Sequence, residues 1–146
     1  MASLTDLVRL GLLQPKPVDA TRVRAWHLRS TKDLRVVAVL REVDDQRAMA
    51  VAYEAGYRAC VSMVDLFGYR VTSQPGHHRA AIDAATIILG DDRRPLLRRL
   101  DRARRFRNET LYGDAPGVST SDLQQLVKDV TWLLDELARQ LREAAG

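Results

Sequence analysis

The residues with the clearest chemical potential lie in the stretch from Arg104 to Tyr112, which reads RRFRNETLY. At about 100° per residue, a helix through this stretch places Arg107 in the same sector as the apolar side chains of Leu100 and Leu111. A guanidinium directed into an apolar seam is costly unless it meets an anion, a carbonyl group or an interface. The helical phase therefore singles out Arg107 as the residue that most needs a partner.

Two interpretations of Arg107 are open. In the first, it is a structural arginine that pairs with a carboxylate of the helical core, such as Asp83 or Glu109, and periodicity alone favours this interpretation. In the second, it faces phosphate in a cleft, with Asn108 and Tyr112 beside it. Arginine suits phosphate because its planar guanidinium donates two parallel hydrogen bonds.

The same part of the chain carries a run of arginine. Eight arginines and no lysine lie between Arg93 and Arg107. Such a run is more often the solvated face of a helix, but arginine without lysine leans towards phosphate. The members nearest to Arg107 are Arg102, Arg104 and Arg105, and we expect them to follow the backbone of a bound nucleic acid.

His77, His78 and Arg79 form a second polar group, in the first turn of an expected helix. Free backbone amides at a helix N-terminus favour anions, and these side chains add hydrogen-bond donors there. Adjacent helical residues diverge by about 100°, so one metal ion shared by the two histidines is poorly supported. We expect no metal site and no cofactor. By default we expect one of the two histidines to have a structural role and the other to be exposed to solvent. The alternative is that they bind RNA.

The elements that must position these residues are predicted to be helices. They are expected at about residues 5–13, 19–43 (with a kink or short break allowed at 30–33), 45–67, 77–89, 91–112 and 119–141. Residues 68–76 are expected to form a loop, and no convincing strand is found. Because four long helices are joined by short loops, the fold class is all-α, an antiparallel bundle of four to five helices.

Three single residues carry further expectations about this bundle. Gly56 weakens its helix by about 1 kcal/mol relative to alanine, so we expect close approach of another helix there. Cys60 lies on the apolar face of the same helix and is expected to be a buried structural thiol. His27 is expected to be packed or half-exposed. The leucine stripe of the last helix is expected to pack on the bundle or to form a dimer seam.

Length and composition limit the alternatives. A chain of 146 residues predicts one domain, with residues 1–18 as a short N-terminal helix and Pro linker and residues 19–146 as the bundle. The net charge of +4 permits nucleic-acid or acidic protein partners without establishing one. With one cysteine and no apolar run near the ~20 residues of a membrane span, we expect a cytoplasmic protein without a membrane partner.

Three pieces of sequence together resemble one known family. They are Ala52–Ala55, then Gly68–Arg70 followed by Gly76–His78, then Arg104–Asn108 followed by Tyr112. Their order and separation make the stretch from Tyr53 to Tyr112 similar to a HEPN domain, the "higher eukaryotes and prokaryotes nucleotide-binding" helical family. The similarity is closest to small stand-alone actinobacterial members.

The resemblance implies a bundle of four to five helices that usually dimerises. The motif of the family is an arginine, a polar residue, a few spacers and then a histidine, and two copies form a basic cleft for RNA. Active members cleave RNA without a metal, and many act in toxin–antitoxin, phage-defence or CRISPR systems beside a nucleotidyltransferase partner. On this chain Arg107 matches the arginine and Asn108 the polar residue.

The chain departs from the motif where the histidine is expected, because Tyr112 stands there and no histidine follows. Histidine, with a pKa of about 6.5, moves a 2′-hydroxyl proton near neutral pH, whereas tyrosine, at about 10, is a poor base. Tyr112 could still stack on a base or donate to a phosphate. His77 or His78 could supply the proton relay if the loop at Gly76 folds over the cleft.

Three functions follow as hypotheses. The first is a HEPN-type module that binds RNA or a nucleotide in a toxin–antitoxin or phage-defence setting, with Arg107, Asn108 and Tyr112 in a ribonuclease-like cleft. The second is an active, metal-independent ribonuclease toxin that uses Tyr112 or the histidines. The third is a non-catalytic interaction bundle that partners a nucleotidyltransferase or an antitoxin protein.

Overall fold

The computed structural model describes residues 2–112 and 119–145, and of residues 107–112 it describes the backbone alone. The helices are α1 (Leu4–Arg9), α2 (Ala20–Leu40), α3 (Asp45–Leu66), α4 (His77–Leu89), α5 (Arg94–Tyr112) and α6 (Thr120–Ala145). A single-turn 3₁₀ helix, η1 (Asp91–Arg93), leads into α5, and two short strands are β1 (Leu13–Pro15) and β2 (Tyr69–Val71). The expectation of a helical fold is confirmed. No helix in these ranges has the length and apolar character needed to cross a membrane.

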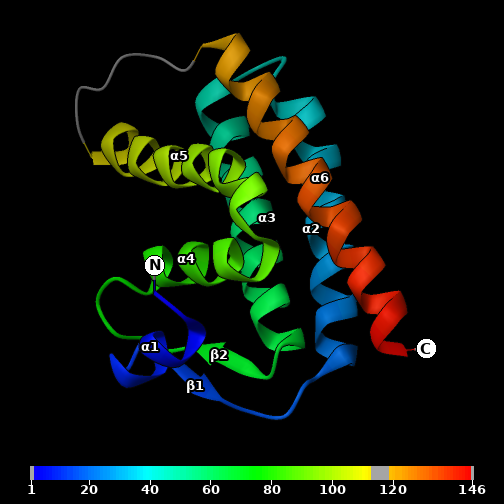
Figure 1. Ribbon diagram of the computed structural model, residues 1–146. Helices are drawn as coiled ribbons and strands as arrows, with labels where there is room; N and C mark the ends of the chain where they lie inside the picture. The colour runs from blue at the N-terminus through cyan, green and yellow to red at the C-terminus, as the bar shows by residue number, and fades with distance from the viewer. Residues whose placement is uncertain (1, 113–118, 146) are drawn as a thin grey trace.

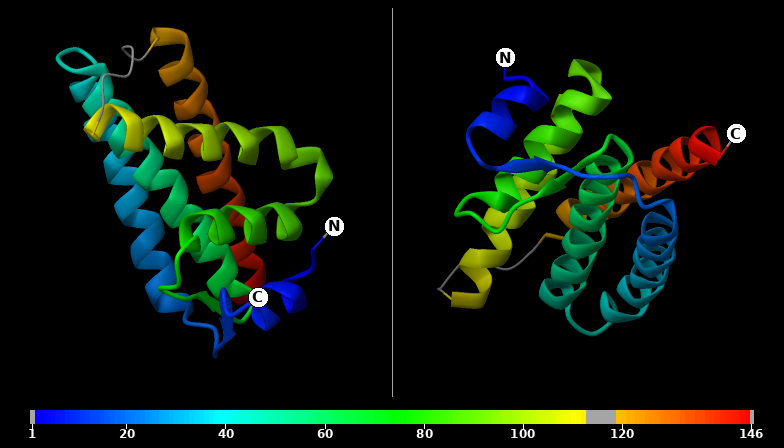
Figure 2. Two further views of the ribbon diagram at one scale, coloured as in Figure 1. Left: turned by 90° about the vertical axis from the view of Figure 1, so that its left-hand side faces the viewer. Right: turned by 90° about the horizontal axis from the view of Figure 1, so that it is seen from below.

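Helix α3 is the centre of the molecule. Helices α2, α3 and α6 run side by side, with α2 antiparallel to α3, and α4 and α5 lie across them (Figure 1, Figure 2). Each of these four neighbours contacts α3. The layout is therefore not a simple up-and-down bundle, because two of the long helices run transverse to the others. Dimerisation stays a prediction.

The expected close approach at Gly56 is confirmed. A Cβ atom at this position would lie 2.9 Å from Leu100 Cδ1 of α5 and 3.0 Å from Val130 Cγ2 of α6. Leu100 and Val130 are fully buried, as are Tyr53 and Cys60 of α3. The absence of a side chain at Gly56 thus lets α5 and α6 pack directly on α3, which fixes where the polar residues of α5 come to lie.

Helix α2 is continuous through residues 30–33, where the sequence allowed a break. The residues that resembled capping signals point into the protein instead. Ser30 Oγ donates to the carbonyl oxygen of Ala55 at 3.1 Å, and Arg58 Nη1 donates to Asp33 Oδ2 at 2.8 Å. Because a tertiary partner occupies each side chain, neither competes for the backbone of α2. The expected cap at Asp19 is confirmed, since its side chain accepts from the amide of Arg22 at 3.0 Å.

The expectation that the chain contains no strand was wrong. Strands β1 and β2 pair antiparallel, with Gln14 opposite Arg70. The first helix also ends at Arg9 rather than near residue 13, and Gly11, at a φ of 77°, turns the chain towards β1. Three-residue strands that pair across more than fifty positions leave no local pattern in the sequence. This pairing holds residues 13–15 against the end of α3.

Candidate functional site

Helices α3 and α4 bring four rings together at the N-terminus of α4. We name the side chains of Tyr53, Tyr57, His77 and His78 the tyrosine–histidine cluster. The His78 ring stacks on Tyr57 with 4.2 Å between centroids and an interplanar angle of 17°, and the His77 ring lies 4.6 Å from the His78 ring. The two tyrosines project from successive turns of α3, so a continuous helix fixes their spacing.

A buried phenol orients His78. Tyr53 is fully buried, and its hydroxyl lies 2.9 Å from His78 Nδ1, with donor and acceptor roles that depend on the tautomer. Burial raises the pKa of Tyr53 above its ordinary value and raises the pKa of Tyr57 to about 12. Both phenols are therefore neutral near pH 7. A neutral Tyr53 can donate to Nδ1 or accept from it, and either arrangement fixes the His78 ring.

A buried carboxylate collects three arginines next to this cluster. Asp101 of α5 is 8% exposed and lies 3.0 Å from Arg104 Nε, 3.6 Å from Arg79 Nη1 and 3.8 Å from Arg105 Nε. We name Arg79, Arg104 and Arg105 the arginine group. Arg79 also donates to Asp83 at 3.0 Å, and this hydrogen bond is the main reason that its pKa is raised. The three guanidinium groups share the carboxylates of Asp83 and Asp101, and Glu54 of α3 adds negative charge near the tyrosines. An anion would therefore be held here by hydrogen bonds from the guanidinium groups rather than by a large excess of positive charge.

The arginine group adjoins the tyrosine–histidine cluster. The positive charge of Arg104 acts on the Tyr53 phenol, where it lowers the pKa against the larger effect of burial. Arg105 and Arg79 are 62% and 60% exposed, so solvent or a ligand can reach them. The arrangement combines stacked rings with accessible guanidinium groups, and such combinations bind single-stranded nucleic acid through its bases and phosphates.

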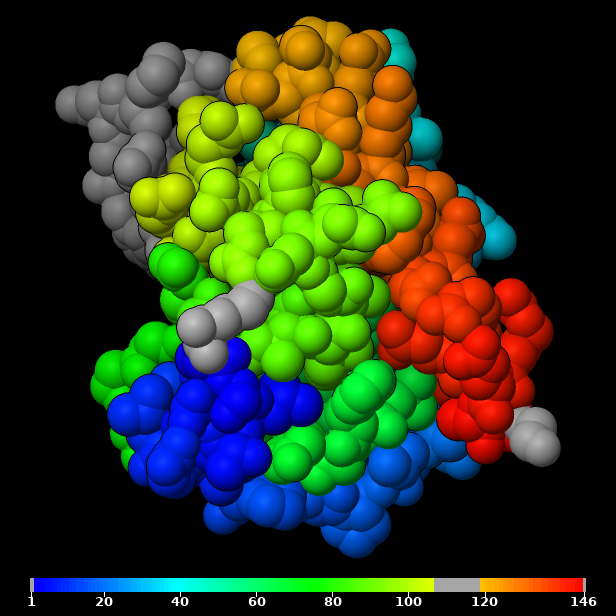
Figure 3. Space-filling view, viewed as in Figure 1, coloured from blue at the N-terminus to red at the C-terminus, as the bar shows by residue number. Residues whose placement is uncertain are grey.

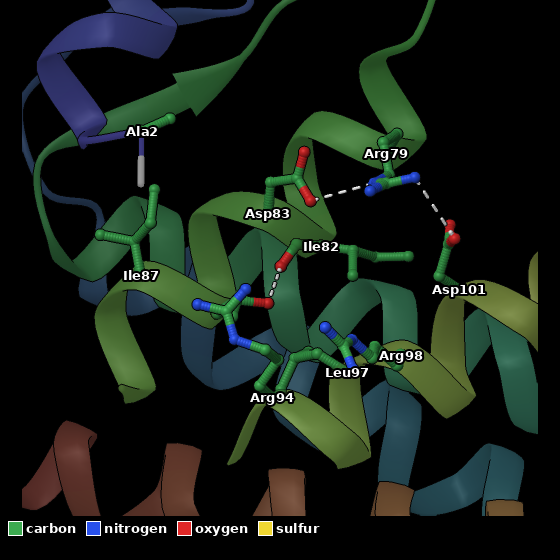
Figure 4. Close-up of a pocket in the computed structure, with 10 residues that line it drawn as sticks. Ala2, Arg79, Ile82, Asp83, Ile87, Arg94, Leu97, Arg98 and Asp101 are labelled. Atoms are coloured by element: carbon green, nitrogen blue, oxygen red, sulfur yellow. Dashed lines mark hydrogen bonds and ion pairs between the residues drawn. The ribbon is translucent and has the colours of Figure 1, made fainter. Parts of the chain in front are cut away.

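A groove of about 270 Å³ runs between α4 and α5 below this site. In Figure 4, Arg94 and Arg98 reach into it from α5, and Arg79 and Asp83 border it from α4. Figure 3 shows the face of the molecule on which α4, α5 and the N-terminal segment are exposed, and Ala2 lines the edge of the groove. Arg94 donates to Asp91 at 2.7 Å. Because most of these cations have carboxylate partners, the groove alone gives an anion little uncompensated charge.

The structure brings together some of the residues that the sequence singled out. His77, His78, Arg79, Arg104 and Arg105 all lie at the site described above. Arg102 does not join them, because it lines a separate pocket of about 370 Å³ between α5 and α6.

The side chains of Arg107, Asn108 and Tyr112 lie outside the described residues. The backbone of α5 does continue through them to Tyr112. The two interpretations of Arg107, structural or phosphate-facing, therefore both stay predictions.

Sequence analysis missed two parts of the site, namely the carboxylate of Asp101 and the two tyrosines that meet His78. Asp101 is the single acidic residue between Arg93 and Arg107, three and four positions before Arg104 and Arg105. That spacing could have indicated ion pairs within the helix. Tyr57 left no comparable signal, because only the folded chain places it beside His78.

The expectations for Cys60 and His27 are confirmed. Cys60 is fully buried, and burial raises the pKa of its thiol to about 12, so it is not a reactive nucleophile near neutral pH. His27 is half-buried, with Nε2 at 3.0 Å from the carbonyl oxygen of Leu134. Over residues 2–112 and 119–145, as far as side chains are described, no three His, Cys, Asp or Glu residues gather as metal ligands would.

Comparisons of this chain with protein-family models, with curated proteins and with solved structures find no match.

Proposed function

We propose that this protein is a HEPN-type module that binds RNA in a toxin–antitoxin or phage-defence setting. The observation that carries the proposal is the position of the arginine group beside the tyrosine–histidine cluster on α3, α4 and α5, where the charge of Arg104 acts on the Tyr53 phenol. Helix α5 also carries Arg107 and Asn108, which match the family motif, so the motif begins one turn beyond Arg104. The geometry supports a site for RNA, and the resemblance in sequence supports the HEPN-type assignment and its setting.

In this proposal each part of the site has one role. Arg79, Arg104 and Arg105 neutralise the phosphates of a single strand, and Arg107 with Asn108 holds the phosphate at the centre of the cleft. The stacked pair of Tyr57 and His78 offers a flat surface next to them for an unpaired base. Tyr112 contacts a base or a sugar, and a second copy of the chain completes the cleft.

The first experiment measures binding of a labelled single-stranded RNA by fluorescence anisotropy over a range of salt concentrations. Affinity should fall steeply with salt, and Arg104→Ala should reduce the slope of log affinity against log salt by about 1. Arg107→Ala should weaken binding at every salt concentration. Arg139→Ala serves as the control, because Arg139 lies on α6 and pairs with Glu136 and Glu143. If the folded double variant Arg104→Ala/Arg107→Ala binds the RNA as tightly as the parent protein does, the proposal is wrong.

A second candidate function is a metal-independent ribonuclease, and the Tyr53–His78 hydrogen bond favours it. An imidazole that a buried phenol orients can accept the 2′-hydroxyl proton, after which the 2′-oxygen attacks phosphorus and the 5′-oxygen departs with a proton from a second group. His78 would then replace the histidine that the motif lacks.

This candidate is tested by incubating RNA with the protein and a chelator and by analysing the ends. A 2′,3′-cyclic phosphate end that disappears with His78→Gln supports cleavage. Intact RNA under all conditions rules it out and leaves the binding function standing.

A further inference from the structure

The outer face of α2 is an amphipathic surface without a partner in the described chain. At about 100° per residue, Arg24, Leu28, Lys32, Arg35, Val36 and Val39 fall within about 120° of one another, and we name these six residues the α2 outer face. Leu28 is 54% exposed, Val36 44% and Val39 69%. The opposite side of the helix buries Val23 and Val37.

The position of α2 leaves this face accessible. Helix α2 lies at the edge of the molecule, with α3 and α6 on its inner sides (Figure 2). Val43, in the turn after α2, is 84% exposed. Single exposed aliphatic residues are ordinary on protein surfaces. Here Val36 and Val39 lie one helical turn apart and Leu28 lies on the same face beyond Lys32, so one partner helix could cover all three.

The charges on this face point to an acidic partner. Lys32 and Arg35 are exposed, and neither forms an ion pair with any residue whose side chain is described. Arginines at the border of the face differ, since Arg22 pairs with Asp19 and Arg29 pairs with Asp33. The surface thus combines exposed aliphatic side chains with uncompensated positive charge.

We propose that the α2 outer face docks an acidic amphipathic helix of a partner protein. An apolar seam on that helix would cover Leu28, Val36 and Val39, and its flanking carboxylates would meet Lys32 and Arg35. A second copy of this chain fits less well, because it would bring like charges together. RNA also fits less well, because aliphatic side chains offer no ring for a base to stack on. This inference does not depend on the proposed function.

The test uses the full chain and two synthetic peptides of about the length of α2. One carries leucine along one helical face and glutamate elsewhere, and the matched peptide has lysine in place of every glutamate. The acidic peptide should bind, more weakly as salt rises, and the basic peptide should not. Lys32→Glu/Arg35→Glu should weaken binding roughly tenfold or more, and Leu28→Ser/Val39→Ser about tenfold. Leu10→Ser is the matched control, because Leu10 is 68% exposed and lies outside α2.

Several results would overturn the proposal. Equal binding of both peptides, no binding of the acidic peptide, or unchanged binding by the two α2 double variants would each do so. Sedimentation with vesicles of phosphatidylglycerol and phosphatidylcholine, without binding of the acidic peptide, would assign the face to anionic lipid. Self-association in analytical ultracentrifugation that Leu28→Ser/Val39→Ser abolishes would assign it to a second copy. Circular dichroism of each variant verifies that the helices are intact.

Discussion

Replacing Gly56 with alanine tests how the core positions the site. The added methyl would lie 2.9 Å from Leu100 Cδ1 and 3.0 Å from Val130 Cγ2, whereas carbon atoms prefer roughly 3.5–4.0 Å. Both neighbours must therefore move by about 0.5–1 Å. Both contacted atoms are side-chain ends, so they can move, but the core around them is closely packed.

The net effect combines two opposing terms. Overpacking of a core costs about 1–3 kcal/mol, and alanine in place of glycine within a helix returns about 1 kcal/mol. We therefore expect Gly56→Ala to lower the free energy of unfolding by about 1 kcal/mol. Gly56→Val adds two more carbon atoms to the same occupied space, and we expect a loss of about 3 kcal/mol.

Urea denaturation followed by circular dichroism measures both values, provided that the m-value stays constant. A double-mutant cycle isolates one of the two contacts, because Val130→Ala removes Val130 Cγ2 and leaves Leu100 Cδ1 in place. In the Val130→Ala background, Gly56→Ala should cost about 1 kcal/mol less than in the parent. Val127→Ala, on the same helix, is the control and should be additive with Gly56→Ala. A Gly56→Ala protein more stable than the parent would refute the reasoning.

Two further predictions concern pH and a buried ion pair. Because burial raises the pKa of Tyr57 to about 12 and raises that of Tyr53 as well, the folded protein retains protons that the unfolded chain releases near pH 10. Burial also raises the pKa of the Cys60 thiol from 9.0 to about 12. The free energy of unfolding should thus hold steady below about pH 9 and fall from there to about pH 12, less steeply in Tyr57→Phe. An equal fall in both proteins would contradict this. Asp65, 3% exposed, accepts from Lys16 Nζ at 2.6 Å and from the amide of Asp19 at 2.9 Å. Asp65→Asn should cost about 3 kcal/mol in urea denaturation, and a loss below about 1 kcal/mol would show that the pair contributes little.

The sequence predicted well those features that depend on helical period and local capping. The apolar face of α3, the close approach at Gly56 and the cap at Asp19 each follow from residues within a few turns of one another. Local patterns did not reveal that Ser30 and Asp33 would turn inwards, because their partners lie on α3. The pairing of β1 with β2 was missed for the same reason, since only tertiary packing brings the two segments together.

The candidate site was also predicted in part, for the same reason. Arginines and histidines stood out by type and spacing, and the structure brings five of them together at α4 and α5. The partners that orient them could not be read from spacing, since Tyr53 meets His78 only when α3 and α4 pack together. Arg102 was expected at the same site because it is close to Arg104 in sequence. It lines another pocket, because its position on the helix turns its side chain towards α6. What Arg107, Asn108 and Tyr112 contact stays a prediction.

The three histidines of the chain provide the most direct test of where RNA binds. His77 and His78 belong to the tyrosine–histidine cluster, whereas His27 contacts the carbonyl oxygen of Leu134, away from it. NMR spectra of the imidazole groups, recorded as a short single-stranded RNA is added, follow all three residues at once. We predict that the signals of His77 and His78 shift with RNA concentration while that of His27 stays in place. Binding of RNA that leaves His77 and His78 unchanged would contradict the proposed site.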